Sequence, residues 1–103
     1  MIKVSVLYAN TDGCKFDHDY YLTHHMPMIK EKMGPALLAT GIDKGLAGGS
    51  PGSPAPYICM GYMNFESVES FQQSFGAHAE VIMADIPNYT DIEPVLQISE
   101  IVQ

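Results

Sequence analysis

Alternating apolar and polar residues at the start of the chain predict a β-strand. Every second side chain there is apolar, at the positions Ile2, Val4, Val6 and Tyr8. This is the two-residue period of a half-buried strand, and the turn-forming residues 10–13 end it. From Asp17 to about Met33 the apolar period becomes that of a helix, which Gly34 and Pro35 stop. We therefore expect a strand followed by a helix.

The remaining pattern predicts a second helix and three more strands. Ser67 is placed to cap the helix, whose apolar stripe is Val68, Phe71, Phe75, Ala79 and Ile82. The strands are expected at residues 37–46, 57–65 and 95–102. Residues 47–56, rich in Gly, Ser and Pro, are expected to form a mobile loop, and residues 85–90 an irregular turn.

The order of these elements, βαββαβ, predicts the fold class. It is the ferredoxin-like α+β arrangement, an antiparallel four-stranded sheet with two helices on one face. At 103 residues the chain has room for one domain, so we expect residues 1–103 to fold as a single unit.

Apolar side chains are expected on both faces of this sheet. In the third strand the alternating sets are Cys59, Met63 and Phe65 on one face, and Ile58, Met60 and Tyr62 on the other. A sheet with one face in water alternates between apolar and polar residues. Because the helices cover only one face, we expect a second copy to cover the other and form a homodimer. Scattered exposed apolar residues are the alternative explanation.

Composition and charge disfavour several classes of binding partner. The chain is 47% hydrophobic and 17% charged, and its net charge of −7 includes only five Lys and Arg. This balance disfavours nucleic acid and anionic membranes as partners. No run reaches the roughly 18 apolar residues of a membrane span, and the first residues lack the pattern of a targeting peptide, so we expect a cytoplasmic protein. Cys14 and Cys59 are expected to be free thiols.

The first predicted helix carries the candidate chemistry. On a helical wheel its mainly apolar arc holds Tyr21, Leu22, His25, Met26, Met28, Ile29 and Met33. His25 should therefore face the sheet and His24 should face water. A histidine in an apolar cleft changes charge near neutral pH, which suits proton transfer. Pro27 is expected to bend the helix and shift its register.

We take His25 and Tyr21 as candidate catalytic residues. The candidate substrate-binding residues are Tyr8, Leu22, Met28 and Tyr62, where Tyr8 and Tyr62 qualify if they point from the sheet toward the helices. The alternative for His25 is a structural imidazole satisfied by a backbone carbonyl.

Metal and cofactor patterns are missing from the sequence. The histidines, at positions 18, 24, 25 and 78, lack metal-ligand spacing. The glycine-rich segment 47–56 lacks the Lys-Ser/Thr pair of a phosphate cradle. We therefore expect neither a metal nor a nucleotide cofactor, and we regard residues 47–56 as a connector or, alternatively, a lid over the cleft.

Three segments resemble the EthD family (ethyl tert-butyl ether degradation). They are Phe16, Tyr20 and Tyr21 with His25–Met26–Pro27; residues 61–65 with Phe71 and Phe75; and residues 85–90 with Glu93 and Pro94. The resemblance spans nearly the whole chain. It implies a dimeric α+β barrel, in which two sheets pack face to face, and a pocket between helices and sheet near His25.

The resemblance implies a range of functions. Relatives of this barrel include cofactor-free monooxygenases, polyketide cyclases, haem-degrading enzymes and proteins without known activity, and a fold alone does not fix a function. Our leading hypothesis is a small auxiliary catabolic protein that acts on a small, mostly apolar oxygenated compound by metal-free proton-transfer or oxidation chemistry. His25 would transfer the proton, and the tyrosines would orient the substrate or stabilise an oxyanion. The alternatives are a non-catalytic binder of a hydrophobic ligand and a dimeric accessory protein whose cavity its own side chains fill.

Overall fold

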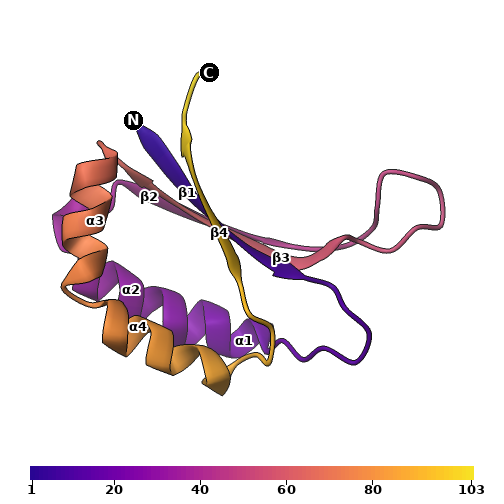
Figure 1. Ribbon diagram of the computed structural model, residues 1–103. Helices are drawn as coiled ribbons and strands as arrows, with labels where there is room; N and C mark the ends of the chain where they lie inside the picture. The colour runs from indigo at the N-terminus through magenta and orange to yellow at the C-terminus, as the bar shows by residue number, and fades with distance from the viewer.

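The computed structural model describes residues 1–103 and shows two layers, a sheet and a group of helices on one of its faces (Figure 1). The strands are β1 (Ile2–Ala9), β2 (Ala39–Lys44), β3 (Tyr57–Phe65) and β4 (Val95–Glu100). All pairs are antiparallel, in the order β2-β3-β1-β4. The predicted ferredoxin-like α+β fold is confirmed. The second and fourth strands are shorter than the alternation suggested.

The helical layer contains more breaks than the sequence predicted. Its segments are α1 (His18–Tyr20), the π-helical turn η1 (Tyr21–His25), α2 (Met26–Met33), the 3₁₀ turn η2 (Gly34–Ala36), α3 (Val68–Gly76), α4 (Ala79–Asp85) and the 3₁₀ turn η3 (Ile86–Asn88). Ser67 caps α3 as expected, because its side chain accepts the backbone N–H of Ser70. The second predicted helix is divided between α3 and α4. No helix is long and apolar enough to cross a bilayer.

The register of the first helical stretch changes before Pro27, not beyond it as the sequence suggested. The backbone N–H of Met26 donates to the carbonyl of Tyr21, five residues earlier, which defines the π turn. Pro27 has no N–H, and a proline ring crowds the carbonyl four residues before it. A wider turn at this point relieves the crowding, and π turns of this kind are frequent at functional sites.

The core lies between the helices and the inner face of the sheet. Its buried apolar residues from the sheet are Ile2, Val4, Tyr8, Cys59, Met63 and Phe65. Facing residues of antiparallel strands point to the same side of a sheet, and Val4 lies opposite Met63. The helices contribute Tyr21, Met26, Ile29, Met33, Phe71 and Ile82. The alternation in the sequence therefore identified the buried face correctly.

No helix covers the outer face of the sheet (Figure 1), and this face carries a row of apolar side chains. Leu7 lies opposite Met60 on one side and opposite Val95 on the other. Tyr62 also lies on this face, where the Nζ atom of Lys3 sits 4.6 Å from the centre of its ring. Tyr62 therefore does not point toward the helices, which corrects the expectation that it reaches the same cleft as Tyr8.

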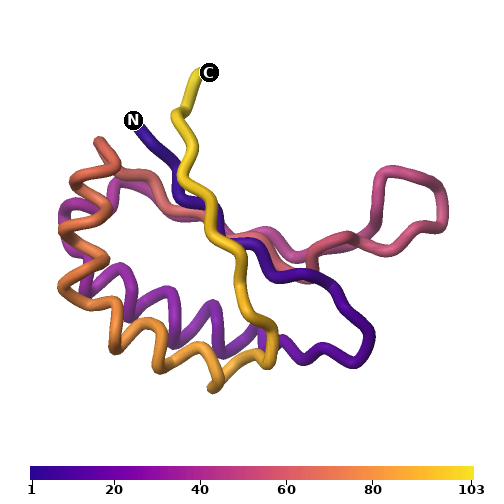
Figure 2. Tube along the Cα trace, viewed as in Figure 1, coloured from indigo at the N-terminus to yellow at the C-terminus, as the bar shows by residue number.

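The segment 47–56 forms the tip of a long extension between β2 and β3 (Figure 2). The C-terminal end of this segment is held by Asn10, the residue that follows β1. The Asn10 backbone N–H donates to the carbonyl of Pro56 at 3.0 Å, and the Asn10 side-chain amide donates to the carbonyl of Ala55 at 2.9 Å. Seen from this side, the extension projects away from the helical layer (Figures 1 and 2). In this position it is a connector and does not cover the cleft beside His25.

Candidate functional site

The π turn places Tyr21 and His25 on the same buried face. Their rings stack, with centres 5.5 Å apart and planes inclined by 16°. Both side chains are buried, whereas His24 is exposed and stacks on Tyr20. The prediction that His25 faces the sheet and His24 faces water is confirmed.

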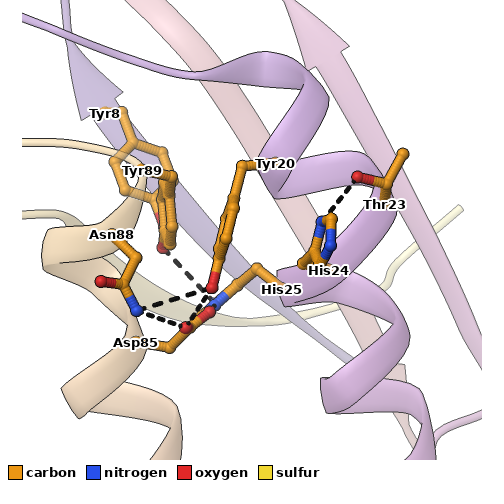
Figure 3. A network of polar contacts seen from close by, with 8 residues as sticks. All are labelled: Tyr8, Tyr20, Thr23, His24, His25, Asp85, Asn88 and Tyr89. Carbon is orange, nitrogen blue, oxygen red and sulfur yellow. Dashed lines mark hydrogen bonds and ion pairs between the residues drawn. The ribbon is translucent and has the colours of Figure 1, made fainter.

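His25 is held by Asp85, the last residue of α4 (Figure 3). The distance from His25 Nδ1 to Asp85 Oδ2 is 2.8 Å. The other carboxylate oxygen accepts the hydroxyl of Tyr20 at 2.7 Å and the side-chain amide of Asn88 at 2.9 Å. Both oxygens of Asp85 are thus engaged, which fixes the carboxylate and, through it, the imidazole.

The charge states of this pair follow from burial and hydrogen bonding. Burial lowers the pKa of His25, and the hydrogen bond to Asp85 opposes this effect only in part. Partial burial would raise the pKa of Asp85, but the hydrogen bonds from Asn88, Tyr20 and His25 hold it below its ordinary value. At neutral pH a neutral imidazole therefore donates its Nδ1–H to a carboxylate, and Nε2 keeps its lone pair.

Two phenols extend this pair into the interior. The hydroxyl of Tyr89 lies 3.4 Å from His25 Nε2 and 2.7 Å from the hydroxyl of Tyr8. Burial raises the pKa of both tyrosines, so both remain neutral hydroxyls. Asp85, His25, Tyr89 and Tyr8 therefore form a chain of hydrogen bonds from the partly exposed carboxylate to the sheet.

Tyr21 approaches β3 closely at Gly61, where any larger residue would require the phenol to shift. A β-carbon on Gly61 would lie 2.5 Å from the hydroxyl of Tyr21. The missing side chain of Gly61 thus makes room for the phenol against the sheet. Burial also raises the pKa of Tyr21, and the neighbouring hydroxyl of Tyr8 adds to this shift.

A cavity of about 40 Å³ lies beside these groups. Its lining consists of Val6, Tyr8, Tyr21, His25, Met63, Phe75, Ile82, Met83, Ile86, Pro94 and Leu96. The lining is polar at one end, where His25 and the two tyrosines lie, and apolar elsewhere. A single water needs roughly 10–15 Å³ of such space, so the cavity as it stands has room for a few water molecules.

The structure brings together three of the six residues predicted for the site. Tyr8, Tyr21 and His25 share the cavity. Leu22 is exposed, because the π turn changes the angular spacing on which the helical wheel relied. Met28 packs against the core but does not line the cavity, and Tyr62 lies on the opposite face.

Asp85 and Tyr89 are the site residues that sequence reasoning missed. They flank the 3₁₀ turn η3, in the segment expected to be an irregular turn. The resemblance to the EthD family included this segment, which was the one signal that pointed to it. The chain has no group of three His, Cys, Asp or Glu side chains arranged to hold a metal ion. Cys14 and Cys59 are free thiols.

Comparison with known proteins identifies the family. Residues 15–93 match the model of the EthD domain. An EthD-like protein from Ralstonia eutropha JMP134 is 46% identical over 99% of this chain and 92% of its own, with a TM-score of 0.95. An ethyl tert-butyl ether degradation (EthD) family protein from Bacillus halodurans C-125 is 22% identical over 99% of both chains, with a TM-score of 0.66.

A more distant structure shares the fold. A dimeric ferredoxin-like protein of unknown function from Thermobifida fusca YX is 13% identical over 97% of this chain and 90% of its own, with a TM-score of 0.58. No curated protein matches the chain significantly. The match over most of its length and the 46% identity show that this chain belongs to the EthD family.

Proposed function

We propose that this EthD-family chain is a small catabolic enzyme in which His25 acts as a general base on a small, mostly apolar oxygenated compound. The observation that carries the proposal is the orientation of the imidazole. Nδ1 is bound to Asp85 at 2.8 Å, which leaves Nε2 as the basic nitrogen, in a side chain that lines the cavity. The chemistry proposed here requires neither a metal nor a nucleotide.

The roles of the neighbouring groups follow from the direction of proton movement. Nε2 takes a proton from the ligand, directly or through the hydroxyl of Tyr89, and Asp85 stabilises the imidazolium that forms. The hydroxyls of Tyr21 and Tyr8 donate to the oxyanion that develops on the ligand. Removal of a proton beside a carbonyl gives an enolate, which can cyclise within the molecule or react with dioxygen as a co-substrate, so the proposed reaction class is cyclase-like or monooxygenase-like.

A second candidate function is a non-catalytic binder or accessory protein. The small size of the cavity favours it, because about 40 Å³ is far below the roughly 300–1,000 Å³ of pockets that hold small-molecule substrates. Both nitrogens of His25 also have partners within the protein. In this case His25 would hold the interior together or supply one hydrogen bond to an apolar ligand.

The two candidates separate in a proton-exchange experiment. A panel of neutral ketones and phenols in D₂O is incubated with the protein, and exchange at acidic C–H positions is followed by NMR. A general base typically contributes about 10²–10⁴-fold, so His25→Gln should remove acceleration of that order, and His24→Gln, in the exposed neighbour, should keep it. Equal acceleration by His25→Gln would contradict the enzymatic role, and binding without any exchange would favour the binder.

We also propose that a second copy of the chain covers the outer face of the sheet. The uncovered row of Leu7, Met60 and Val95 supports it. The related Thermobifida protein is dimeric. Leu7→Glu should shift sedimentation from dimer to monomer, because it would bury a charge. Val81→Glu on α4 should leave it unchanged, and a monomeric wild-type chain would refute the proposal.

A further inference from the structure

Two side chains lie both in the lining of the cavity and at the protein surface. Met83 of α4 and Leu96 of β4 line the cavity, yet they are 48% and 43% exposed. Lining residues such as Tyr8, His25 and Ile82 are buried. Met83 and Leu96 therefore lie where the cavity that contains His25 meets the surface.

The position of β4 explains why these lining residues are exposed. β4 is an edge strand that pairs only with β1. On the helical side of the sheet, α4 runs near the N-terminal end of β4 (Figure 1). Ile98, which points to the same face of β4 as Leu96, is 42% exposed. The helices therefore leave the inner side of β4 partly open, and this opening lies next to the cavity.

We propose that a ligand reaches His25 between Met83 and Leu96, and that these two side chains set the size of the compound admitted. The inference rests on the proposed site at His25, but it does not depend on which reaction occurs there. No Lys, Arg, Asp or Glu lines the cavity. The admitted compound is therefore neutral. Its oxygen-bearing end would point toward His25 and the tyrosines, and its apolar part toward the entrance between Met83 and Leu96.

The two side chains are suited to move. A ligand of several heavy atoms does not fit in about 40 Å³, so part of the lining must turn aside. Methionine is unbranched and has three rotatable bonds, which makes it adaptable. Because Met83 and Leu96 are already half exposed, they can turn toward solvent without opening a void in the core. Buried lining residues such as Met63 lack this freedom.

Each of these residues has a matched control in its own element. Val81 lies on α4 and is 44% exposed, but does not line the cavity. Ile98 lies on the same face of β4 as Leu96, has nearly the same exposure, and is likewise absent from the lining. Truncation of either control removes a similar amount of exposed apolar surface. Only the truncations at Met83 and Leu96 widen the proposed entrance.

The test uses phenol and 2-naphthol as neutral probes of increasing size, with binding followed by NMR at the His25 imidazole. Met83→Ala and Leu96→Ala should each tighten binding of 2-naphthol by about fivefold, equivalent to about 1 kcal/mol. The effect on phenol should be smaller. Val81→Ala and Ile98→Ala should leave both affinities unchanged. Leu96→Trp, checked for folding by circular dichroism, should weaken binding of both probes.

Three results would overturn the inference. They are an equal effect of the control truncations, probe binding that does not perturb the His25 resonances, and no binding of either probe to any variant. Failure of the proposed catalysis looks different, because probe affinity would then respond to Met83 and Leu96 although no proton exchange is accelerated. Conversely, if proton exchange depends on His25 while probe affinity is unchanged by substitution of Met83 and Leu96, the proposed entrance is refuted but the proposed catalysis is not.

Discussion

The two faces of the sheet differ in whether their buried polar groups have hydrogen-bond partners. On the inner face the hydroxyl of Tyr8 is joined to Tyr89 and, through it, to His25 and Asp85. On the outer face the Asn64 side-chain oxygen is buried without a donor, beside exposed apolar residues. Buried polar groups in folded proteins are almost always hydrogen-bonded. The polar groups of the inner face are therefore joined within one chain, whereas the outer face keeps exposed apolar residues that we propose a second copy covers.

The largest expected difference between the faces comes from two methionines of β3. Met63 on the inner face is 5% exposed and Met60 on the outer face is 42% exposed. Met63→Ala should lower the free energy of unfolding by about 2–5 kcal/mol, because it leaves a cavity in a packed core. Met60→Ala should have a clearly smaller effect at low protein concentration, and chemical denaturation at several concentrations measures both. Equal losses at high dilution would show that the outer face is packed within the single chain.

A smaller effect is expected where Tyr21 meets the sheet. Gly61→Ala places a methyl group in the space of the Tyr21 hydroxyl, and overpacking of this kind costs typically about 1–3 kcal/mol. Gly76→Ala is the control, since its added β-carbon meets nothing within 4 Å. Thermal unfolding compares the two. If Gly61→Ala is as stable as the control, the phenol of Tyr21 does not occupy this position in solution.

The sequence predicted the two faces and the orientation of the histidines, because each depends on a local period. Alternation in β1 and β3 divided each strand into two sets, and it grouped Tyr62 with Met60. It did not say which set of β3 faces the helices, so the expectation that Tyr62 could reach the cleft was wrong. The helical wheel was correct for Tyr21 and His25 but not for Leu22, since a π turn is not visible in the pattern of apolar residues.

Asp85 and Tyr89 could not be predicted by the same means. They lie 60 and 64 positions from His25 along the chain, and only the packing of α4 and η3 against the first helical stretch brings them to it. A local period carries no information about which distant turn lies above a helix. The hydrogen bonds that orient His25 are therefore a product of tertiary structure.

A smaller effect is expected on stability as a function of pH, and its sign is fixed by the lowered pKa of His25. Burial lowers the pKa of His25 below that of an unfolded chain, which is about 6.5. The unfolded state therefore binds more protons as pH falls below this value, and the free energy of unfolding should decline from about pH 6.5 downward. His25→Gln should make this decline shallower, although His18, whose pKa is also lowered by burial, keeps part of it. An unchanged slope in His25→Gln would show that this imidazole titrates normally.

The most direct test of the central claim is ¹⁵N NMR of the His25 imidazole as a function of pH, in the wild type and in Asp85→Asn. We predict a neutral ring at pH 7 with its proton on Nδ1 and a pKa below the ordinary value, because of burial and despite Asp85. Asp85→Asn should lower this pKa further, because the carboxylate that favours the imidazolium is removed. A ring that is charged at pH 7, or neutral with its proton on Nε2, would contradict the assignment of His25 as a base.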